Sequence, residues 1–151
     1  MHKRIALILT MVFVIASAVG CAQEEPTPTS APVETAALTI TGLVESVPEW
    51  SVADLRAMPQ TSTDYVNKDG ETVTYTGVAL SILLENAGCG SEATTIAFLA
   101  SDGYSAEGDL AEVSGVDGGI VAIEDNGSLR MVLPDISGKL QVKDVVEIKI
   151  K

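Results

Sequence analysis

The side chains that most often perform catalysis are scarce in this chain, and this restricts the chemistry open to it. The sequence holds two cysteines, Cys21 and Cys89, and one histidine, His2, among its first residues. Beyond His2 there is no imidazole, which excludes a Ser-His-Asp triad, a Cys-His pair, histidine zinc sites and an imidazole base. We therefore expect no catalytic residue and no metal ligands.

Three further sets of residues offer ligand chemistry. Glycines on both sides of Cys89 would leave a reactive or metal-binding thiol accessible, but a small, part-buried loop residue is the preferred interpretation. Four oxygen-bearing side chains surround Gly70: Asp64, Asn67, Asp69 and Glu71. Calcium favours such clusters, yet the spacing is not that of an EF-hand, so polar turn residues are favoured. Trp50 and Tyr104 are the aromatic candidates for stacking on a ligand, although core or rim packing is the preferred interpretation.

The residues before Cys21 predict where the protein resides. A basic start at residues 2–4 precedes the uncharged apolar run Ile5–Ala18, and the small residues Ala18-Val19-Gly20 lead to the cysteine. This is the anatomy of a secretory signal over residues 1–20. The apolar run is shorter than the ~20 residues of a spanning helix, although an uncleaved anchor is the alternative. Cys21 in this position resembles the lipobox of bacterial lipoproteins, so we expect lipidation there and a lipid-anchored, extracytoplasmic protein of the cell envelope.

Charge limits the partners of the exported part. Removing residues 1–20 takes away Lys3 and Arg4, which leaves seven basic residues against 21 acidic ones, a formal charge of −14. Such a chain repels nucleic acid and anionic lipid headgroups. With Cys21 acylated, Cys89 has no partner for a disulfide, so the core must hold by packing.

The elements that must position these residues are mostly short strands. Residues 21–37 are rich in Pro, Thr and Glu and predict a disordered tether. From residue 38 the pattern predicts an α+β, β-rich mixed-sheet domain over 38–151 with two short helices, at 52–58 and 80–86. Strands are expected at 38–44, within 64–76, and at 94–100, 120–123, 129–133 and 145–150. Turns are expected at Lys68-Asp69-Gly70, Asp102-Gly103 and Asp125-Asn126-Gly127.

Several segments line up, in order, with one family. Leu38–Val44 resembles the opening strand of the oxidoreductase molybdopterin-binding domain of the sulfite oxidase type. Thr76–Gly88 is similar to that family's Thr-Gly-Val helix, and Ala100–Tyr104 is similar to its Asp-Gly-Tyr turn. Leu129–Pro134, followed by Gly138, Lys139, Val142, Lys143 and Ile148, resembles its final arginine strand and Gly-Lys…Val-Lys run. The resemblance implies a β-rich mixed fold.

The sequence departs from the family where the metal would be held. In the enzymes that it resembles, a cysteine thiolate just before the Thr-Gly-Val helix ligates molybdenum. Here the matching stretch, Ser62–Gly70, has no cysteine, and Cys89 lies after the helix. A soft metal of this kind requires a thiolate. The family also holds its pterin phosphate with His, Arg and Lys, whereas Arg56 and Arg130 are the only arginines after residue 20.

The resemblance places the C-terminal cations near the family's cofactor. Arg130, Lys139 and Lys143 could then be remnants of an anion pocket, but surface pairing with Asp135, Asp144 and Glu147 is the preferred interpretation. Tyr104 joins these three as a candidate ligand-binding residue. We expect a tethered, cofactor-free module that binds a small ligand or an envelope protein. A molybdopterin-dependent oxidoreductase with an altered metal site is the alternative.

Overall fold

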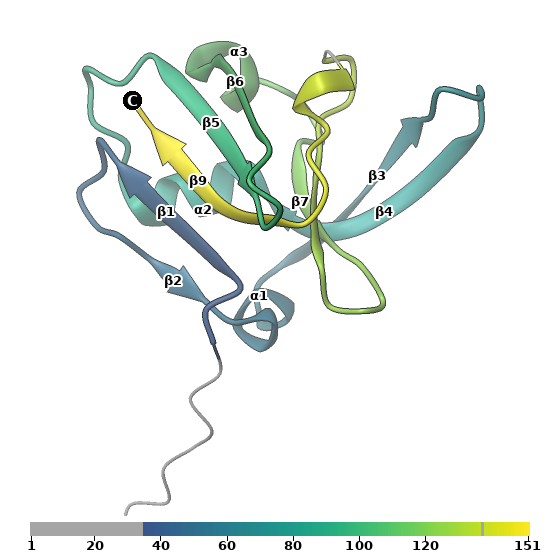
Figure 1. Ribbon diagram of the computed structural model, residues 1–151, viewed down its shortest axis with the longest axis horizontal. Coiled ribbons are helices and arrows are strands. Elements are labelled where there is room, and N and C mark those ends of the chain that lie inside the picture. The colour runs from purple at the N-terminus through teal and green to yellow at the C-terminus, as the bar shows by residue number, and fades with distance from the viewer. Residues whose placement is uncertain (1–34, 137) are drawn as a thin grey trace, which may run out of the picture. The chain divides into compact units, whose positions relative to one another are not determined.

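The computed structural model describes residues 35–136 and 138–151, which form two β-sheets and several short helices (Figure 1). The first sheet has the strand order β2-β1-β9-β5-β6. It is mixed, because β1 and β9 are parallel while the other neighbours are antiparallel. Its strands are β1 (Leu38–Gly42), β2 (Glu49–Trp50), β5 (Thr95–Ala100), β6 (Ser105–Asp109) and β9 (Val145–Ile150).

The second sheet is antiparallel with the order β3-β4-β7-β8. Its strands are β3 (Gln60–Val66), β4 (Thr72–Ala79), β7 (Ile120–Ile123) and β8 (Leu129–Val132). Strand β4 pairs with all of β3 but meets β7 only over Gly77–Ala79. The outer part of the hairpin, residues 64–74, therefore extends from the sheet as a two-stranded arm, seen at the right of Figure 1.

The helices are short and have recognisable ends. Helix α1 (Val52–Ala57) begins with a complete capping box between Ser51 and Asp54, and α2 (Leu80–Ala87) ends at Gly88 in the left-handed region, as the sequence predicts. Two helical elements were not predicted: α3 (Leu110–Ser114), which Asp109 caps, and the 3₁₀ helix η1 (Gly138–Leu140). Strands β2 and β6 were not predicted either. No helix within the described residues is long and apolar enough to cross a membrane.

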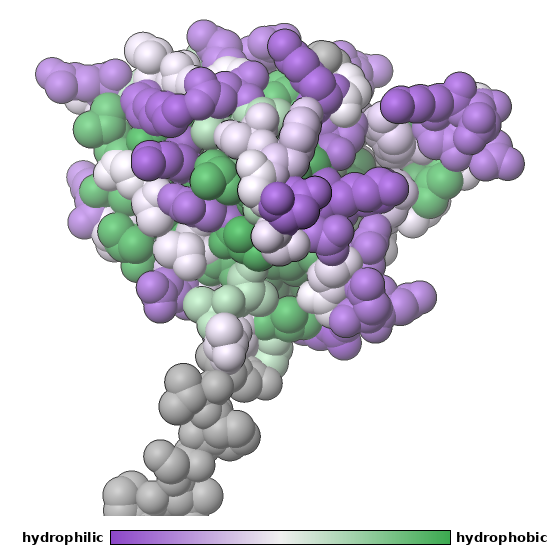
Figure 2. All heavy atoms as spheres, in the orientation of Figure 1, coloured by the Kyte–Doolittle hydropathy of each residue, from purple (hydrophilic) through white to green (hydrophobic). Residues whose placement is uncertain are grey.

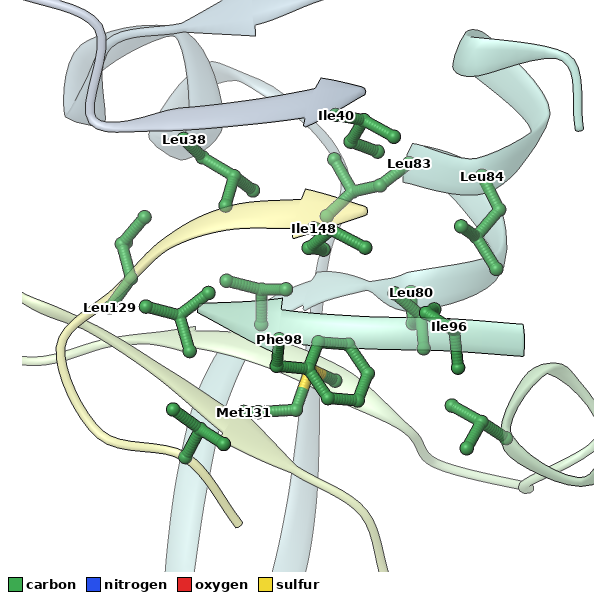
Figure 3. Packing of buried hydrophobic residues seen from close by; sticks show 14 of the residues in the cluster. Leu38, Ile40, Leu80, Leu83, Leu84, Ile96, Phe98, Leu129, Met131 and Ile148 are labelled. Atoms are coloured by element: carbon green, nitrogen blue, oxygen red, sulfur yellow. The ribbon is translucent and has the colours of Figure 1, made fainter. Parts of the chain in front are cut away.

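The core lies between the two sheets and is closed by α2 (Figure 3). Leu83 of α2, Phe98 of β5 and Met131 of β8 are fully buried in it. Gly77 of the Thr-Gly-Val stretch lets β4 and β7 approach closely, because a Cβ atom there would lie 2.0 Å from the Val121 carbonyl oxygen. The predicted β-rich α+β fold class is thus confirmed, with a core that needs no disulfide among the described residues.

Three hairpins close with the same three-residue turn, all at predicted positions. The loops are Lys68–Gly70, Ser101–Gly103 and Asp125–Gly127, and their glycines have φ of 80°, 89° and 84°. Each glycine N–H donates to the carbonyl three residues earlier. A type I turn followed by a left-handed residue has this pattern, and glycine is the residue that adopts the last position without strain.

Candidate functional site: a basic groove between the arm and the C-terminal segment

Two adjoining hollows, of about 620 and 330 Å³, lie between the tip of the β3–β4 arm and the chain from Gly138 to Asp144. They share Lys68, Gly138, Gln141 and Lys143 and therefore form one groove. We call it the basic groove, and define it by Lys68, Tyr104, Arg130, Lys139, Gln141 and Lys143. The structure thus brings together the four predicted ligand-binding residues, Tyr104, Arg130, Lys139 and Lys143, and adds Lys68 to them.

The first wall of the groove is the turn at the tip of the arm. The Asn67 side chain organises this turn: its Oδ1 accepts from the backbone N–H groups of Asp69 and Glu71, both at 2.9 Å. Its Nδ2 donates to Glu71 Oε2 at 3.0 Å. Lys68 lies in the turn and is exposed. In Figure 2 the end of the arm, at the upper right, is covered mainly by hydrophilic residues.

The second wall is the segment from η1 to Lys143. Leu140 and Val142 are buried, whereas Lys139 and Lys143 are exposed, so that apolar anchors alternate with the two lysines. Gln141 fixes the segment to the end of β8, because its side chain accepts from the Leu133 N–H at 2.9 Å and donates to the Leu133 carbonyl at 2.5 Å. The lysines are therefore held on a firmly packed strip of backbone.

Arg130 connects the groove to the outer face of the second sheet. Its Nη1 donates to Tyr75 Oη at 3.0 Å, and its Cζ lies 5.3 Å from the centre of the Tyr75 ring. Its Nε lies 3.0 Å from Glu124 Oε1, an ion pair by distance in which the N–H does not point at the carboxylate as a hydrogen bond requires. The Arg130 side chain is 15% exposed, so it contributes one partly buried positive charge to the groove.

Tyr104 lines the part of the groove next to η1. Its Oη donates to the Lys139 carbonyl at 3.1 Å, which ties the Ser101–Gly103 turn to η1. The residue is 49% exposed, so part of the ring remains free to contact a ligand. Trp50, the other aromatic candidate, packs against the hydrophobic core instead.

The charges in the groove contrast with those of the whole molecule. Of the seven basic residues after residue 20, four line the groove: Lys68, Arg130, Lys139 and Lys143. Within residues 35–136 and 138–151, none of these three lysines forms an ion pair. Three acids also border the hollows, Asp69, Asp102 and Asp144. The expected pairing of the lysines with Asp135, Asp144 and Glu147 is wrong for this structure, and Arg130 pairs with Glu124.

The other candidate sites of the sequence do not assemble. Asp64 accepts from Thr74 Oγ1 at 2.6 Å, while Asn67 and Glu71 bond to each other in the arm turn. No group of three or more metal-ligating side chains exists in the described part of the chain. The oxygen cluster is therefore made of polar turn residues, as preferred from the sequence.

Cys89 lies outside the basic groove. It forms a β-bridge with Val44, and its thiol lies 3.9 Å from the Leu84 carbonyl oxygen. Partial burial raises the pKa of the Cys89 thiol, because desolvation disfavours the thiolate. This is the small, part-buried loop residue that the sequence predicted.

Comparison with known proteins assigns the fold and the family. The family model described as the oxidoreductase molybdopterin binding domain matches residues 24–151. The chain belongs to this family. Among solved structures it is similar to the sulfane dehydrogenase SoxCD from Paracoccus pantotrophus, with 23% sequence identity and a TM-score of 0.63. No curated protein matched.

The similarity covers 75% of this chain but 37% of the SoxCD chain. At this level of identity the likeness concerns the fold. Within that fold, Ser62–Gly70, where the resemblance to the family's enzymes places the metal-binding cysteine, runs along β3 into the first wall of the groove. Tyr65, Asn67, Lys68 and Asp69 of this stretch line the groove, and the stretch supplies no thiol.

Sequence reasoning missed three contributors to the groove: Tyr65, Lys68 and Gln141. In the local sequence, the lysine of a Lys-Asp-Gly turn cannot be distinguished from any other solvent-exposed turn residue. A usable signal was the overall charge: in a chain with so few basic residues, each lysine merits consideration as part of a site.

Proposed function

We propose that this protein is a binding module that takes a small anion in the basic groove and works without a molybdenum centre. The observation that carries the proposal is the convergence of Lys68, Arg130, Lys139 and Lys143 on one groove of a strongly acidic chain. Asp69, Asp102 and Asp144 also border the groove, but none of its three lysines forms an ion pair within the described residues, so an anion between the walls would supply a partner for them.

The size and surroundings of the groove favour a small ligand over a polymer. Its two hollows measure about 620 and 330 Å³, which is the range of small-molecule sites. Outside the groove the chain is dominated by acidic residues. A nucleic acid would be repelled by this surface wherever it extended past the groove.

The groove suits the phosphate of the family's pterin cofactor better than its molybdenum ion. Its lysines and Arg130 are the residue types that hold the phosphate of a pterin cofactor. Its lining residues include no thiol, and Cys89 is not among them. The donor set therefore does not fit a cysteine-ligated molybdenum ion, which requires a thiolate.

Family membership keeps one alternative, a molybdopterin-dependent oxidoreductase with an altered metal site. Elemental analysis discriminates between the two functions. The full chain and its Cys89→Ser variant would be produced in a host that synthesises the cofactor, and purified. We expect well under one molybdenum per chain in both proteins. One molybdenum per wild-type chain would contradict the proposal, and its loss in Cys89→Ser would identify a relocated ligand.

We also propose that the module is attached to a membrane through lipid on Cys21. Cys21, the signal over residues 1–20 and most of the tether over 21–37 lie outside the described residues, so the sequence alone supports this proposal. Replacing Cys21→Ser should release the protein from the membrane fraction. Unchanged attachment would make the apolar run Ile5–Ala18 the anchor instead.

A further inference from the structure

We infer that the bound anion bridges the two walls of the basic groove, and that Asn67 is the positioning residue that holds Lys68 for the contact. This inference rests on the proposed function and makes it more specific. It assigns a role to a residue that does not itself carry charge. It also narrows the ligand to an anion that can accept hydrogen bonds on opposite sides.

The two walls come from separate parts of the fold. Lys68 lies on the tip of the arm, whereas Lys139 and Lys143 lie on the segment that packs against β8. Lys68 and Lys143 border both hollows. An anion held between the walls is therefore surrounded by ammonium groups on two sides, with the Arg130 guanidinium at one end of the groove.

The tip of the arm depends on its own turn for order. Strand β4 has a third-strand partner only over Gly77–Ala79, so residues 64–74 form a two-stranded ribbon, of which Tyr65 packs against the buried cluster of Ile120, Ala122 and Val132. Such ribbons are marginally stable in water. The three side-chain hydrogen bonds of Asn67 with Asp69 and Glu71 are the local contacts that fix the backbone on both sides of Lys68.

The β7–β8 turn shows that this use of Asn67 is not a general feature of the turn type. The residue equivalent to Asn67 in that turn is Glu124, and its carboxylate contacts Arg130 and Ser128 rather than the turn's own N–H groups. There the acceptor is Asn126 Oδ1, which takes a single N–H, that of Ser128, at 2.9 Å. Both turns therefore carry one side-chain bond between their flanking residues, and the arm turn differs in that one side chain, Asn67, accepts from two backbone N–H groups instead of one.

Opposed cationic walls select the chemistry of the ligand. A tetrahedral oxyanion such as phosphate or sulfate, free or as the end of a larger molecule, presents acceptor oxygens in several directions. A monocarboxylate presents its two oxygens on one side and satisfies one wall. We therefore expect inorganic phosphate and sulfate to bind more tightly than acetate at equal ionic strength.

A double-mutant cycle tests the role of Asn67. The full chain in a non-ionic detergent would be titrated calorimetrically with inorganic phosphate, as wild type, Asn67→Ala, Lys68→Gln and the double variant. Each single change should weaken binding by about threefold to tenfold, in keeping with partly exposed charge contacts. The double variant should bind no more weakly than Lys68→Gln, because Asn67 acts through Lys68.

A second variant keeps the test decisive if Asn67→Ala does not fold. Gly70→Ala strains the turn through its positive φ of 80° while its new Cβ meets no atom within 4 Å, and it too should weaken phosphate binding. The inference is overturned if Asn67→Ala weakens binding equally with and without Lys68, or if both single variants bind like wild type. Absence of phosphate and sulfate binding in the wild type would contradict the proposed function itself.

Discussion

Two turns of this protein share one backbone and differ in what they present. The β3–β4 turn ends in Gly70 and the β7–β8 turn in Gly127, with φ of 80° and 84°. Their glycine N–H groups donate to the carbonyls of Asn67 and Glu124 at 3.1 and 2.9 Å. In both, an Asp/Asn/Gly-rich loop of three residues is sufficient to specify the turn.

The difference between the turns lies in their tips and surroundings. The first position of the loop is Lys68 in the arm turn and Asp125 in the other. Lys68 faces the basic groove, whereas Asp125 borders a separate hollow beside Tyr75 and Glu124. Local sequence therefore determines the shape of a turn, while the rest of the fold determines which turn becomes part of a site.

Both turns belong to the second sheet, which shares one hydrophobic core with the first. The largest expected effect on stability therefore comes from a substitution in that core. Leu83 is fully buried and lies in α2, outside both turns. Leu83→Ala should lower the free energy of unfolding by about 2–5 kcal/mol through lost burial and a residual cavity. Denaturant unfolding measures this. Phosphate affinity of the folded protein should be unchanged, and a matching loss of affinity would show that the groove is not independent of the core.

Exchanging the charges at the two tips tests whether the groove, and not the turn, defines the site. Lys68→Asp should weaken phosphate binding by about tenfold or more, equal to roughly 1.4 kcal/mol. Asp125→Lys, the matched change in the other turn, should leave the affinity within about twofold. Calorimetric titration compares them. Equal and opposite effects from the two variants would mean that phosphate senses net charge alone.

Straining the two turns equally separates stability from binding. At Gly70 and Gly127 a Cβ would meet no atom within 4 Å, so the cost of Gly→Ala comes from the positive φ. Each change should lower the free energy of unfolding by about 1–2 kcal/mol. Only Gly70→Ala should weaken phosphate binding. A similar loss of binding in Gly127→Ala would argue that both turns support the groove.

The capping box of α1 is a local motif remote from both turns, and its expected effect is the smallest. Hydrogen bonds from the backbone N–H and then the side chain of Ser51 lower the pKa of the exposed Asp54 carboxyl. The stabilisation is therefore present at neutral pH and is lost as the pH falls through that lowered pKa. NMR titration should find the pKa of Asp54 below its ordinary value, and raised only part of the way back in Ser51→Ala, because alanine keeps the backbone N–H and removes the hydroxyl. An unchanged pKa in the variant would contradict a contribution from the Ser51 side chain.

The sequence predicts the parts of this fold that short-range chemistry encodes. The turns at Gly70, Gly103 and Gly127 and the helix end at Gly88 all appear where the residues indicate. Strand β6 was missed because Ser-Ala-Glu-Gly-Asp lacks the β-branched pattern; it forms because β5 offers it a partner edge. Helix α3 was missed because five residues are too few for helical periodicity.

The candidate site was predictable only in part. The resemblance to the family pointed to Arg130, Lys139 and Lys143, and Tyr104 was a candidate for stacking on a ligand. The structure places all four in one groove. Lys68 lies about 70 residues before Lys139, and their convergence follows from the pairing of β4 with β7 and of β7 with β8. Such long-range pairing leaves no local pattern in the sequence.

The most direct test of the central claim is the affinity of the full chain for inorganic phosphate, compared between Lys143→Gln and Lys149→Gln. Both lysines are exposed, and they lie six residues apart. Lys143 lines the basic groove, whereas Lys149 lies on β9 opposite Thr41 and Ala97. We predict one phosphate site per chain, weakened by about threefold to tenfold in Lys143→Gln and unchanged in Lys149→Gln. No binding, or equal weakening in both variants, would contradict the assignment of the groove as the anion site.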